Sequence, residues 1–152
     1  MYLEKETFQA VIASTPLISI DLVIKNTQSE YLLGYRTNKP AKGFWFVPGG
    51  RILKDESLAK AFKRLTSEEL GREYRIDQAR FIGPFDHFYQ DNVFGDEFST
   101  HYVAIGYELQ LSEGLSHLPA DIQHQNYQWL GIDAVEASDL VHENTKKYFG
   151  KL

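Results

Sequence analysis

The sequence predicts a mixed α/β (α+β) sandwich, in which helices pack against a mixed β-sheet. One observation is a change of period along the chain. Apolar residues at 58, 61, 62 and 65 follow helical spacing, whereas the runs before and after them are short and rich in β-forming residues. The other observation is the length of 152 residues, 43% hydrophobic and 24% charged. A chain of this size has room for one core, so we expect a single domain over residues 1–152.

The composition argues against several classes of protein. Sixteen basic against 21 acidic residues give a net charge of −5, and no basic run exceeds Lys146-Lys147, so we expect no nucleic-acid partner. The longest apolar run, residues 17–24, contains two polar residues and is far shorter than the roughly 20 residues of a membrane span. The start, residues 1–6, is too acidic for a signal peptide, and the absence of cysteine suits a reducing compartment. We therefore expect a cytoplasmic protein with no membrane partner.

The first third of the chain is expected to hold one helix and three strands. Residues 4–13 carry apolar side chains at helical spacing, which predicts a short amphipathic helix that ends before Pro16. The runs 17–24 and 30–36 are separated by a polar loop and predict an antiparallel pair. Residues 44–47 predict a buried strand, which the following Pro-Gly-Gly ends in a turn.

The rest of the chain begins with the most regular pattern of the sequence. Residues 55–70 predict a helix, with Asp55 or Ser57 as N-cap and Gly71 as C-cap. The other expected elements are strands at 79–89, 100–111 and 126–130 and a closing helix at 138–149.

One carboxylate of the helix predicted at 55–70 lies on its apolar side. On a helical wheel Glu69 falls about 20° from Leu58. Burying an ionised carboxylate costs several kcal/mol unless it is paired or binds a cation. Arg64 and Glu68 lie on the flank, where they can pair with each other or with a phosphate. Together with the glycines directly before the helix, Glu69 predicts a site for a hard cation.

The spacing of these residues resembles the Nudix box, over residues 50–71. The matching positions are Gly50, Glu56, Arg64 and Glu68-Glu69-Leu70-Gly71. In the Nudix family this segment forms a loop-helix-loop on an α/β/α sandwich and binds Mg²⁺ or Mn²⁺ against the diphosphate of a nucleoside diphosphate derivative. The sequence departs from the box at Leu65, where the family has a glutamate, and at Arg72, where it has an apolar residue. Several Nudix enzymes use that glutamate to bind metal or activate water. The resemblance therefore implies either that this chain has lost the hydrolytic activity or that other residues carry out the catalysis.

Over nearly the whole chain the sequence is similar to the GDP-mannose mannosyl hydrolase subfamily of Nudix proteins. The matching segments are Ser14-Thr15-Pro16-Leu17, residues 43–51, Arg64-Leu65-Thr66 and Gln123-His124. The similarity implies Mg²⁺-dependent hydrolysis of GDP-mannose to GDP and mannose, with water attacking sugar C1 and inverting it. It does not rank GDP-mannose against GDP-glucose or GDP-fucose. Glu68 departs from the subfamily, which tends to keep only the second glutamate of the pair. Whether the site binds one metal ion or two therefore remains open.

The same similarity implies a role for each candidate site residue. His124 is implied as general base, and an unperturbed pKa of about 6.5 suits proton abstraction at neutral pH. Glu68 remains an alternative base. The metal ligands implied are the main-chain carbonyl of Gly49 and the side chains of Glu69 and Gln123. The substrate contacts implied are Tyr2, Leu3, Phe8, Asp21, Arg36, Arg51, Arg64, His87 and Tyr102.

The similarity also implies a homodimer, in which residues 1–14 form an arm at the subunit interface and approach the nucleotide partly from the second subunit. Two other functions remain open. A Nudix pyrophosphohydrolase would cut the same substrate at phosphorus, giving GMP and a sugar phosphate, although Leu65 argues against it. A sensor would bind a nucleotide sugar without turnover and would need no base.

Overall fold

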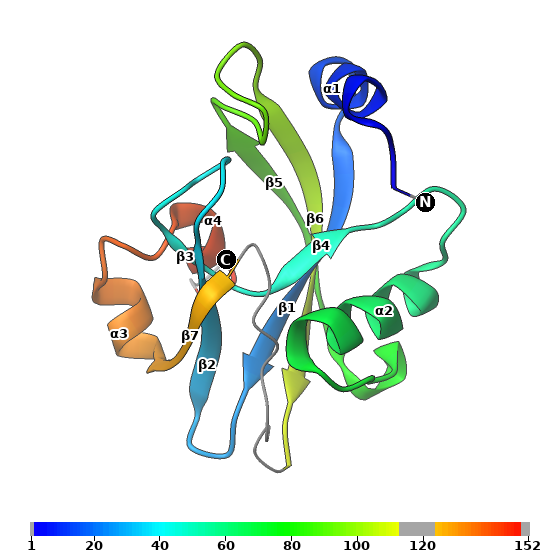
Figure 1. The fold of residues 1–152 in the computed structure, drawn as a ribbon. Coiled ribbons are helices and arrows are strands. Elements are labelled where there is room, and N and C mark those ends of the chain that lie inside the picture. Colours follow the sequence, from blue (N-terminus) through cyan, green and yellow to red (C-terminus); the bar gives the residue numbers. More distant parts are fainter. Residues whose placement is uncertain (1, 113–123, 150–152) are drawn as a thin grey trace.

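The computed structural model describes residues 2–112 and 124–149, and it has a twisted mixed sheet with helices on both faces (Figure 1). Within these residues seven strands form the sheet, five of them in the order β3-β2-β1-β6-β5, while β4 pairs with β1 and β7 with β2. β1 runs parallel to β6 and antiparallel to its other partners, so the predicted mixed α/β class is confirmed. The strands are β1 (Leu17–Lys25), β2 (Glu30–Arg36), β3 (Trp45–Phe46), β4 (Gly49–Arg51), β5 (Arg80–Tyr89), β6 (Thr100–Gln110) and β7 (His124–Gly131).

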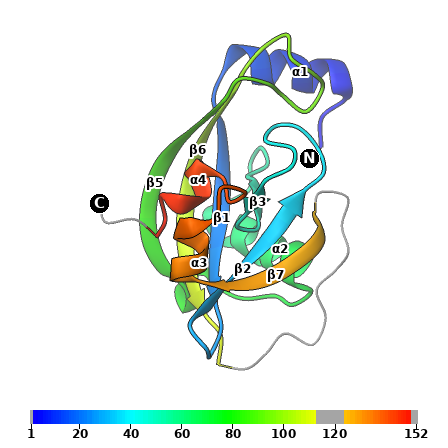
Figure 2. The same ribbon diagram turned by 90° about the vertical axis from the view of Figure 1, so that its left-hand side faces the viewer.

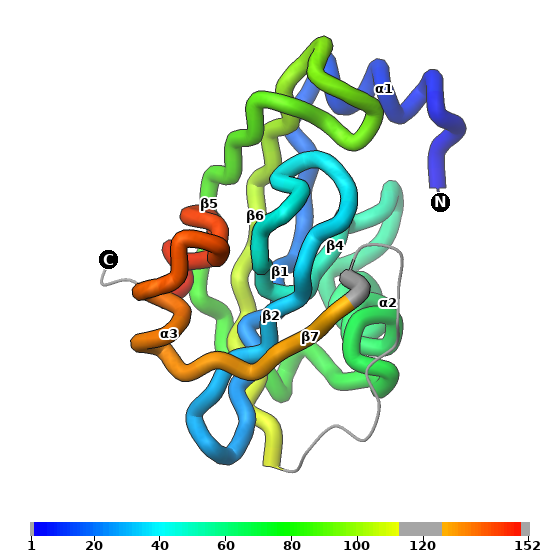
Figure 3. Tube along the Cα trace, turned by 60° about the vertical axis from the view of Figure 1, so that its left-hand side comes forward, coloured from blue at the N-terminus to red at the C-terminus, as the bar shows by residue number. Residues whose placement is uncertain are grey.

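The helices lie in two layers around this sheet. α2 covers one face, and α3 and α4 cover the other (Figures 2 and 3). The bounds are α1 (Lys5–Ser14), α2 (Leu58–Leu70), the short 3-10 helix η1 (Ile76–Gln78), α3 (Ile132–Ala137) and α4 (Glu143–Lys146). α2 is the longest at 13 residues, and none of the described helices has the length and apolar character needed to cross a membrane.

The two layers follow from the two-residue period of β1. Ile20 and Leu22 are fully buried in one cluster with Phe62 of α2. Val23, which follows Leu22 and points to the opposite face of the strand, packs instead in a second cluster with Val135 of α3. Burying each such side chain contributes roughly 1.5–3 kcal/mol, so β1 is held from both sides. The residues of β1 that face α3 and α4 include Asp21, which belongs to the site described below.

The ends of α2 are fixed by local side-chain and main-chain contacts. Of the two predicted N-caps, Ser57 is the one observed: its hydroxyl oxygen accepts a hydrogen bond from the Lys60 N–H at 3.2 Å. Asp55 has a positive φ of 66° and precedes the helix, so α2 begins at Leu58 rather than at residue 55. Gly71 ends the helix with φ 75°, as predicted for the C-cap.

Most of the predicted elements are confirmed with small shifts of their ends. α1, the antiparallel pair β1 and β2, and the strands β5, β6 and β7 occupy the expected segments. The strand predicted at 44–47 is shorter, because only residues 45–46 pair with β2.

The prediction of a simple turn at the glycines after Pro48 was wrong. Residues Gly49–Arg51 form β4, which pairs antiparallel with β1 so that Gly49 lies opposite Asp21. A Cβ atom at residue 49 would lie 2.3 Å from the carbonyl oxygen of Ile20. The glycine therefore allows two strands to approach closely rather than reversing the chain.

The prediction of one closing helix over 138–149 was also wrong. The segment before α4 is extended and pairs with β3: the Trp45 N–H donates to the Leu140 carbonyl at 2.7 Å, and the His142 N–H donates to the Trp45 carbonyl at 3.1 Å. These bonds satisfy main-chain groups that a helix would otherwise pair within itself. Helical structure in this part of the chain is therefore divided between α3 and α4.

Candidate functional site

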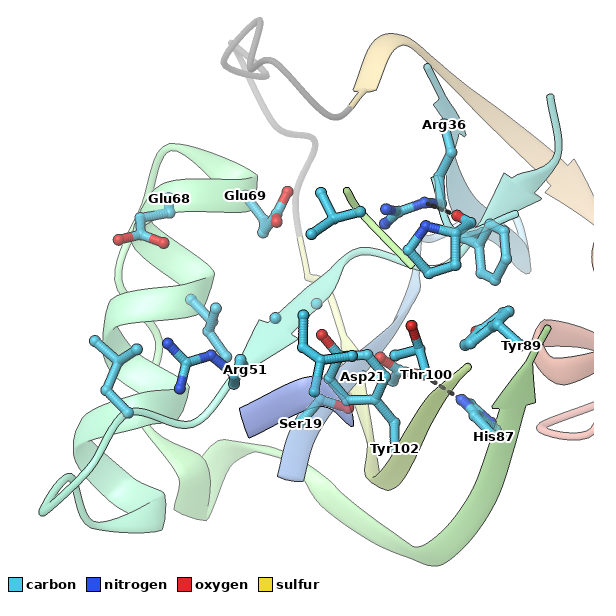
Figure 4. A pocket seen from close by; sticks show the side chains of 18 of the residues that line it. Ser19, Asp21, Arg36, Arg51, Glu68, Glu69, His87, Tyr89, Thr100 and Tyr102 are labelled. Carbon is cyan, nitrogen blue, oxygen red and sulfur yellow. Dashed lines mark hydrogen bonds and ion pairs between the residues drawn. The ribbon is translucent and has the colours of Figure 1, made fainter. Parts of the chain in front are cut away.

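A pocket of about 370 Å³ lies where the strands of the sheet meet α2, β4 and the N-terminal arm (Figure 4). Gln123 lies outside the described residues. For His124 only the main chain is described, at the start of β7 and paired with Arg36. All the other predicted site residues line this one pocket: Tyr2, Leu3, Phe8, Asp21, Arg36, Gly49, Arg51, Arg64, Glu69, His87 and Tyr102.

One wall of the pocket depends on close contact between β4 and α2. A Cβ atom at Gly50 would lie 2.6 Å from Cδ2 of Leu65, so the glycine allows β4 to pack directly on this side chain. Leu65 is 2% exposed and lines the pocket. At the position where the Nudix box has a glutamate, this chain therefore has an apolar contact with β4.

The two glutamates near the end of α2 lie in different surroundings. Glu69 is 6% exposed and points from α2 towards the pocket, which confirms the inward direction expected from the helical wheel (Figure 4). Glu68 is exposed, and its two carboxylate oxygens accept hydrogen bonds from Arg64 at 3.2 Å and from the Tyr2 hydroxyl at 3.4 Å. The buried carboxylate is thus the better ligand for a cation, because less water competes with it.

The oxygen donors around Glu69 suit a hard divalent cation. The Glu69 carboxylate and the main chain of Gly49 line the same pocket, and Mg²⁺ prefers oxygen ligands while keeping waters or substrate phosphates in its shell. Within residues 2–112 and 124–149, no three His, Cys, Asp or Glu side chains gather into a metal-binding group. A cation beside Glu69 would therefore need main-chain, amide, water or substrate oxygens as further ligands.

Arg64 braces the loop before α2. Its Nε and Nη2 donate to the two oxygens of Glu56 at 2.7 and 2.9 Å, and Nη2 also donates to the Arg51 carbonyl at 2.9 Å. The hydrogen bonds from Arg64 lower the pKa of Glu56 to about 2. The predicted pairing of Arg64 with Glu68 is confirmed, whereas the main partner of Arg64, Glu56, was not predicted, although both positions belong to the box pattern.

Two further arginines bring positive charge to the pocket. Arg36 at the end of β2 donates from Nε to the Pro40 carbonyl at 2.9 Å, and its guanidinium carbon lies 5.7 Å from the ring centre of Phe46. Arg51 of β4 lies over the Phe8 ring at 4.8 Å. A guanidinium group matches the oxygens of a phosphate or diphosphate, so these positions suit a diphosphate group.

The N-terminal arm closes one side of the pocket of its own chain. Phe8 packs edge to face against Phe94 from the loop between β5 and β6, with ring centres 5.9 Å apart. Together with the contacts of Phe8 to Arg51 and of Tyr2 to Glu68, this fixes α1 across the opening.

Asp21 of β1 and His87 of β5 form the polar floor of the pocket, on two strands that are separated in the sheet by β6 (Figure 4). Oδ2 of Asp21 accepts a hydrogen bond from the Tyr148 hydroxyl at 2.6 Å and lies 3.8 Å from Nδ1 of His87. Burial raises the pKa of Asp21 to about 6, against the opposing effects of the Tyr148 hydrogen bond and the Arg36 charge. Burial and the charge of Lys147 lower the pKa of His87 to about 4, so this imidazole is neutral at pH 7.

Several residues in or beside the pocket carried no signal in the sequence. Tyr148, which contacts the pocket through its hydrogen bond to Asp21, lies in a segment whose structure was wrongly predicted, 127 residues from this partner. Lys39, near the rim, forms an ion pair of 2.7 Å with Asp96, which links two loops. The other lining residues not predicted include Ser19, Pro40, Tyr89 and Thr100. None of these belongs to a short motif, because the fold alone brings them together.

Comparison with known proteins agrees with this geometry. The family model described as NUDIX domain matches residues 15–151. The low-salt glycan biosynthesis protein Agl8 of Haloferax volcanii is 40% identical over 119 residues, which are 78% of this chain and 73% of that protein.

Two solved structures share the fold at low sequence identity. The MutT protein from Methanosarcina mazei Go1 has a TM-score of 0.69 and 21% identity, covering 90% of this chain and 92% of that one. A bifunctional NMN adenylyltransferase/ADP ribose pyrophosphatase from Francisella tularensis, complexed with AMP and a Mn ion, has a TM-score of 0.66 and 18% identity, covering 95% of this chain and 43% of that one. Since the family model spans nearly all of the described residues and the fold agrees with it, the chain belongs to the Nudix family.

Proposed function

We propose that this Nudix protein is a divalent-cation-dependent hydrolase that converts GDP-mannose to GDP and mannose. The observation that carries the proposal is the single pocket that joins an inward carboxylate, Glu69, to two guanidinium groups and to the carboxylate of Asp21. The first three groups suit a diphosphate with its cation, and Asp21 suits a sugar hydroxyl. A nucleotide-sugar substrate also agrees with the name of the 40% identical relative, which refers to glycan biosynthesis.

The diphosphate half of the substrate is assigned to Arg36, Arg51 and the cation site. Glu69, the main-chain carbonyl of Gly49 and Gln123 are the proposed ligands for Mg²⁺ or Mn²⁺. A cation bound there would stabilise negative charge on the departing diphosphate. The Mn ion named with the Francisella fold neighbour supports a divalent metal in this proposal.

Attack at carbon is favoured over attack at phosphorus because of Leu65, which packs on Gly50 where the box glutamate would stand. In the proposed reaction, His124 takes a proton from water, the water oxygen bonds to C1 on the face opposite the leaving group, and the C1–O bond to GDP breaks with inversion. The pairing of the His124 main chain with Arg36, a pocket residue, supports His124 as this base.

A Nudix pyrophosphohydrolase is the second candidate. It is favoured by Glu68, which adds a second carboxylate beside Glu69, and by the ADP ribose pyrophosphatase among the fold neighbours. This enzyme would cut the same kind of substrate at phosphorus, with Glu68 as ligand or base.

The test is hydrolysis of GDP-mannose with Mg²⁺ in ¹⁸O-labelled water, with the products weighed by mass spectrometry. We expect the label in mannose and none in GDP. Label in GMP or in mannose phosphate would overturn attack at carbon and support the second candidate. Binding of GDP-mannose without any turnover would exclude both hydrolases and support a sensor of nucleotide sugars.

Variants connect this result to the assigned residues. His124→Gln should lower kcat by about 10²- to 10⁴-fold with substrate binding retained. Glu69→Gln should weaken Mn²⁺ binding, measured by calorimetry without substrate. Glu73→Gln is the matched control, because Glu73 pairs with Lys63 at 3.5 Å and is 60% exposed. If the wild-type protein, Glu69→Gln and Glu73→Gln bound Mn²⁺ with equal affinity, Glu69 would not be a ligand of the proposed cation site.

A further inference from the structure

The hydroxyl of Tyr148 reaches the floor of the pocket from the end of the chain. Tyr148 follows α4 and donates a hydrogen bond of 2.6 Å to Oδ2 of Asp21 on β1. A hydrogen bond to a carboxylate at this distance is short and stronger than one between neutral groups. It joins the C-terminal segment to a carboxylate that lines the pocket.

The ring of Tyr148 is held in place by its neighbours. Gly106 of β6 lies beside Asp21 in the parallel register of β1 and β6, and a Cβ atom at Gly106 would lie 2.7 Å from Cε1 of Tyr148. Phe85 packs edge to face on the same ring with centres 4.7 Å apart, and His87 lies at 5.8 Å. The ring thus occupies space that only a glycine at 106 leaves, and from there its hydroxyl reaches the adjacent strand.

The two oxygens of the Asp21 carboxylate have different surroundings as a result. Oδ2 is bonded to Tyr148 and faces His87 at 3.8 Å. Oδ1 lies on the side of Gly49, where an added Cβ atom would approach it to 2.7 Å. Because one oxygen is fixed by the tyrosine, the rotation of the carboxylate is fixed and the other oxygen is kept on the side of β4.

We infer that Tyr148 is a positioning residue, whose hydroxyl holds Asp21 in the orientation in which its carboxylate receives a hydroxyl of the sugar. The inference rests on the proposed function for the identity of the substrate. Tyr148 acts through Asp21 and does not itself contact the substrate. The glycine at 106 is part of the same device, because any larger residue would displace the ring.

Tyr148→Phe tests the inference, since it removes the hydroxyl and keeps the ring. We expect kcat with GDP-mannose to fall about ten- to a hundredfold, as for loss of a hydrogen bond to a charged group. The affinity for GDP, which has no sugar, should stay within about twofold. Tyr31→Phe is the matched control: its ring packs on Phe149, next to Tyr148, at 4.7 Å, and it does not line the pocket. We expect wild-type kinetics for this control.

Two further variants separate positioning from a general structural effect. In an Asp21→Ala background, Tyr148→Phe should cause no further loss, because both changes remove the same interaction. Gly106→Ala should lower kcat as Tyr148→Phe does, by displacing the ring. An additive loss in the Asp21→Ala background, or wild-type kcat for Tyr148→Phe, would overturn the inference.

A crystal structure of Tyr148→Phe provides a readout that does not depend on the reaction. We expect the Asp21 carboxylate to rotate away from its position in the wild-type protein. An unchanged Asp21 side chain would overturn the inference even if the enzyme were slower. Absence of turnover by the wild-type protein would instead count against the proposed function, and the rotation of Asp21 would still decide the role of Tyr148.

Discussion

Glu56 joins the loop before α2 to Arg64 of the helix and so stabilises the segment that resembles the Nudix box. Its carboxylate accepts two hydrogen bonds from Arg64 and one of 3.0 Å from the Leu53 N–H, and its side chain is 14% exposed. We expect Glu56→Gln to lower the free energy of unfolding by about 2 kcal/mol at pH 7, because an arginine would lose its charged partner in a largely buried position. Urea denaturation measures this difference.

The pH dependence of this effect has a defined sign. The pKa of Glu56 is about 2 in the folded protein against 4.5 as its ordinary value, so the ionised carboxylate stabilises the fold fully above pH 4.5. That stability is lost as the pH falls from 4.5 through about 2, and the gap between wild type and Glu56→Gln should be less than half as large at pH 3. Asp55→Asn is the control, since its pair with Lys54 is more than 80% exposed and should contribute under about 0.5 kcal/mol. A gap that stays constant with pH would contradict the assignment.

The two glycines of β4 differ in what an added side chain would contact. At Gly49 an added Cβ atom meets the main chain of Ile20 at 2.3 Å, whereas at Gly50 it meets the end of the Leu65 side chain at 2.6 Å. A main chain within a sheet yields less than a side-chain methyl group. We therefore expect Gly49→Ala to cost about 3 kcal/mol or more and Gly50→Ala about 1 kcal/mol, measured by urea denaturation. The reverse order of stability would show that β4 is held by other contacts.

The elements also show how far the sequence predicts this fold. α2 could be predicted because its period, its Ser57 cap and its Gly71 end are all local. β4 could not, because the need for glycine comes from Ile20, which is nearby only after β1 and β4 pair. The extended segment before α4 depends likewise on its pairing with Trp45, about a hundred residues earlier.

The same distinction between local and long-range contacts applies to the residues of the candidate site. Glu69 could be predicted because the helical wheel compares it with residues of its own helix. The role of Tyr148 could not, because its hydrogen bond to Asp21 joins residues 127 positions apart and no local pattern marks it. Arg64 lies between these cases: its pairing with Glu68 follows from helical spacing, whereas its bond to Glu56 crosses from the helix to the preceding loop.

The N-terminal arm, which includes α1, contacts two sides of the pocket that are far apart in the sequence. Phe8 connects Arg51 of β4 with Phe94 of the loop between β5 and β6. We expect Phe8→Ala to weaken GDP binding about three- to tenfold, because Arg51 would lose the ring that orients it. Phe81→Ala, on a side chain that is 58% exposed at the start of β5, is the control. Calorimetric titration with GDP measures both, and equal affinities would show that the arm does not act on the nucleotide.

The homodimer that the sequence similarity implies would allow the arm to serve either its own pocket or that of the partner. Mixed dimers of Phe8→Ala and Glu69→Gln subunits separate these arrangements. If arms were exchanged, each mixed dimer would contain one pocket with both Glu69 and an intact Phe8, so mixing would restore activity above that of either variant. Because Phe8 contacts Arg51 and Phe94 of its own chain, we expect no restoration after the subunits have been exchanged. Sedimentation must first show that the wild-type protein is a dimer, and restored activity would mean that the arm completes the pocket of the other subunit.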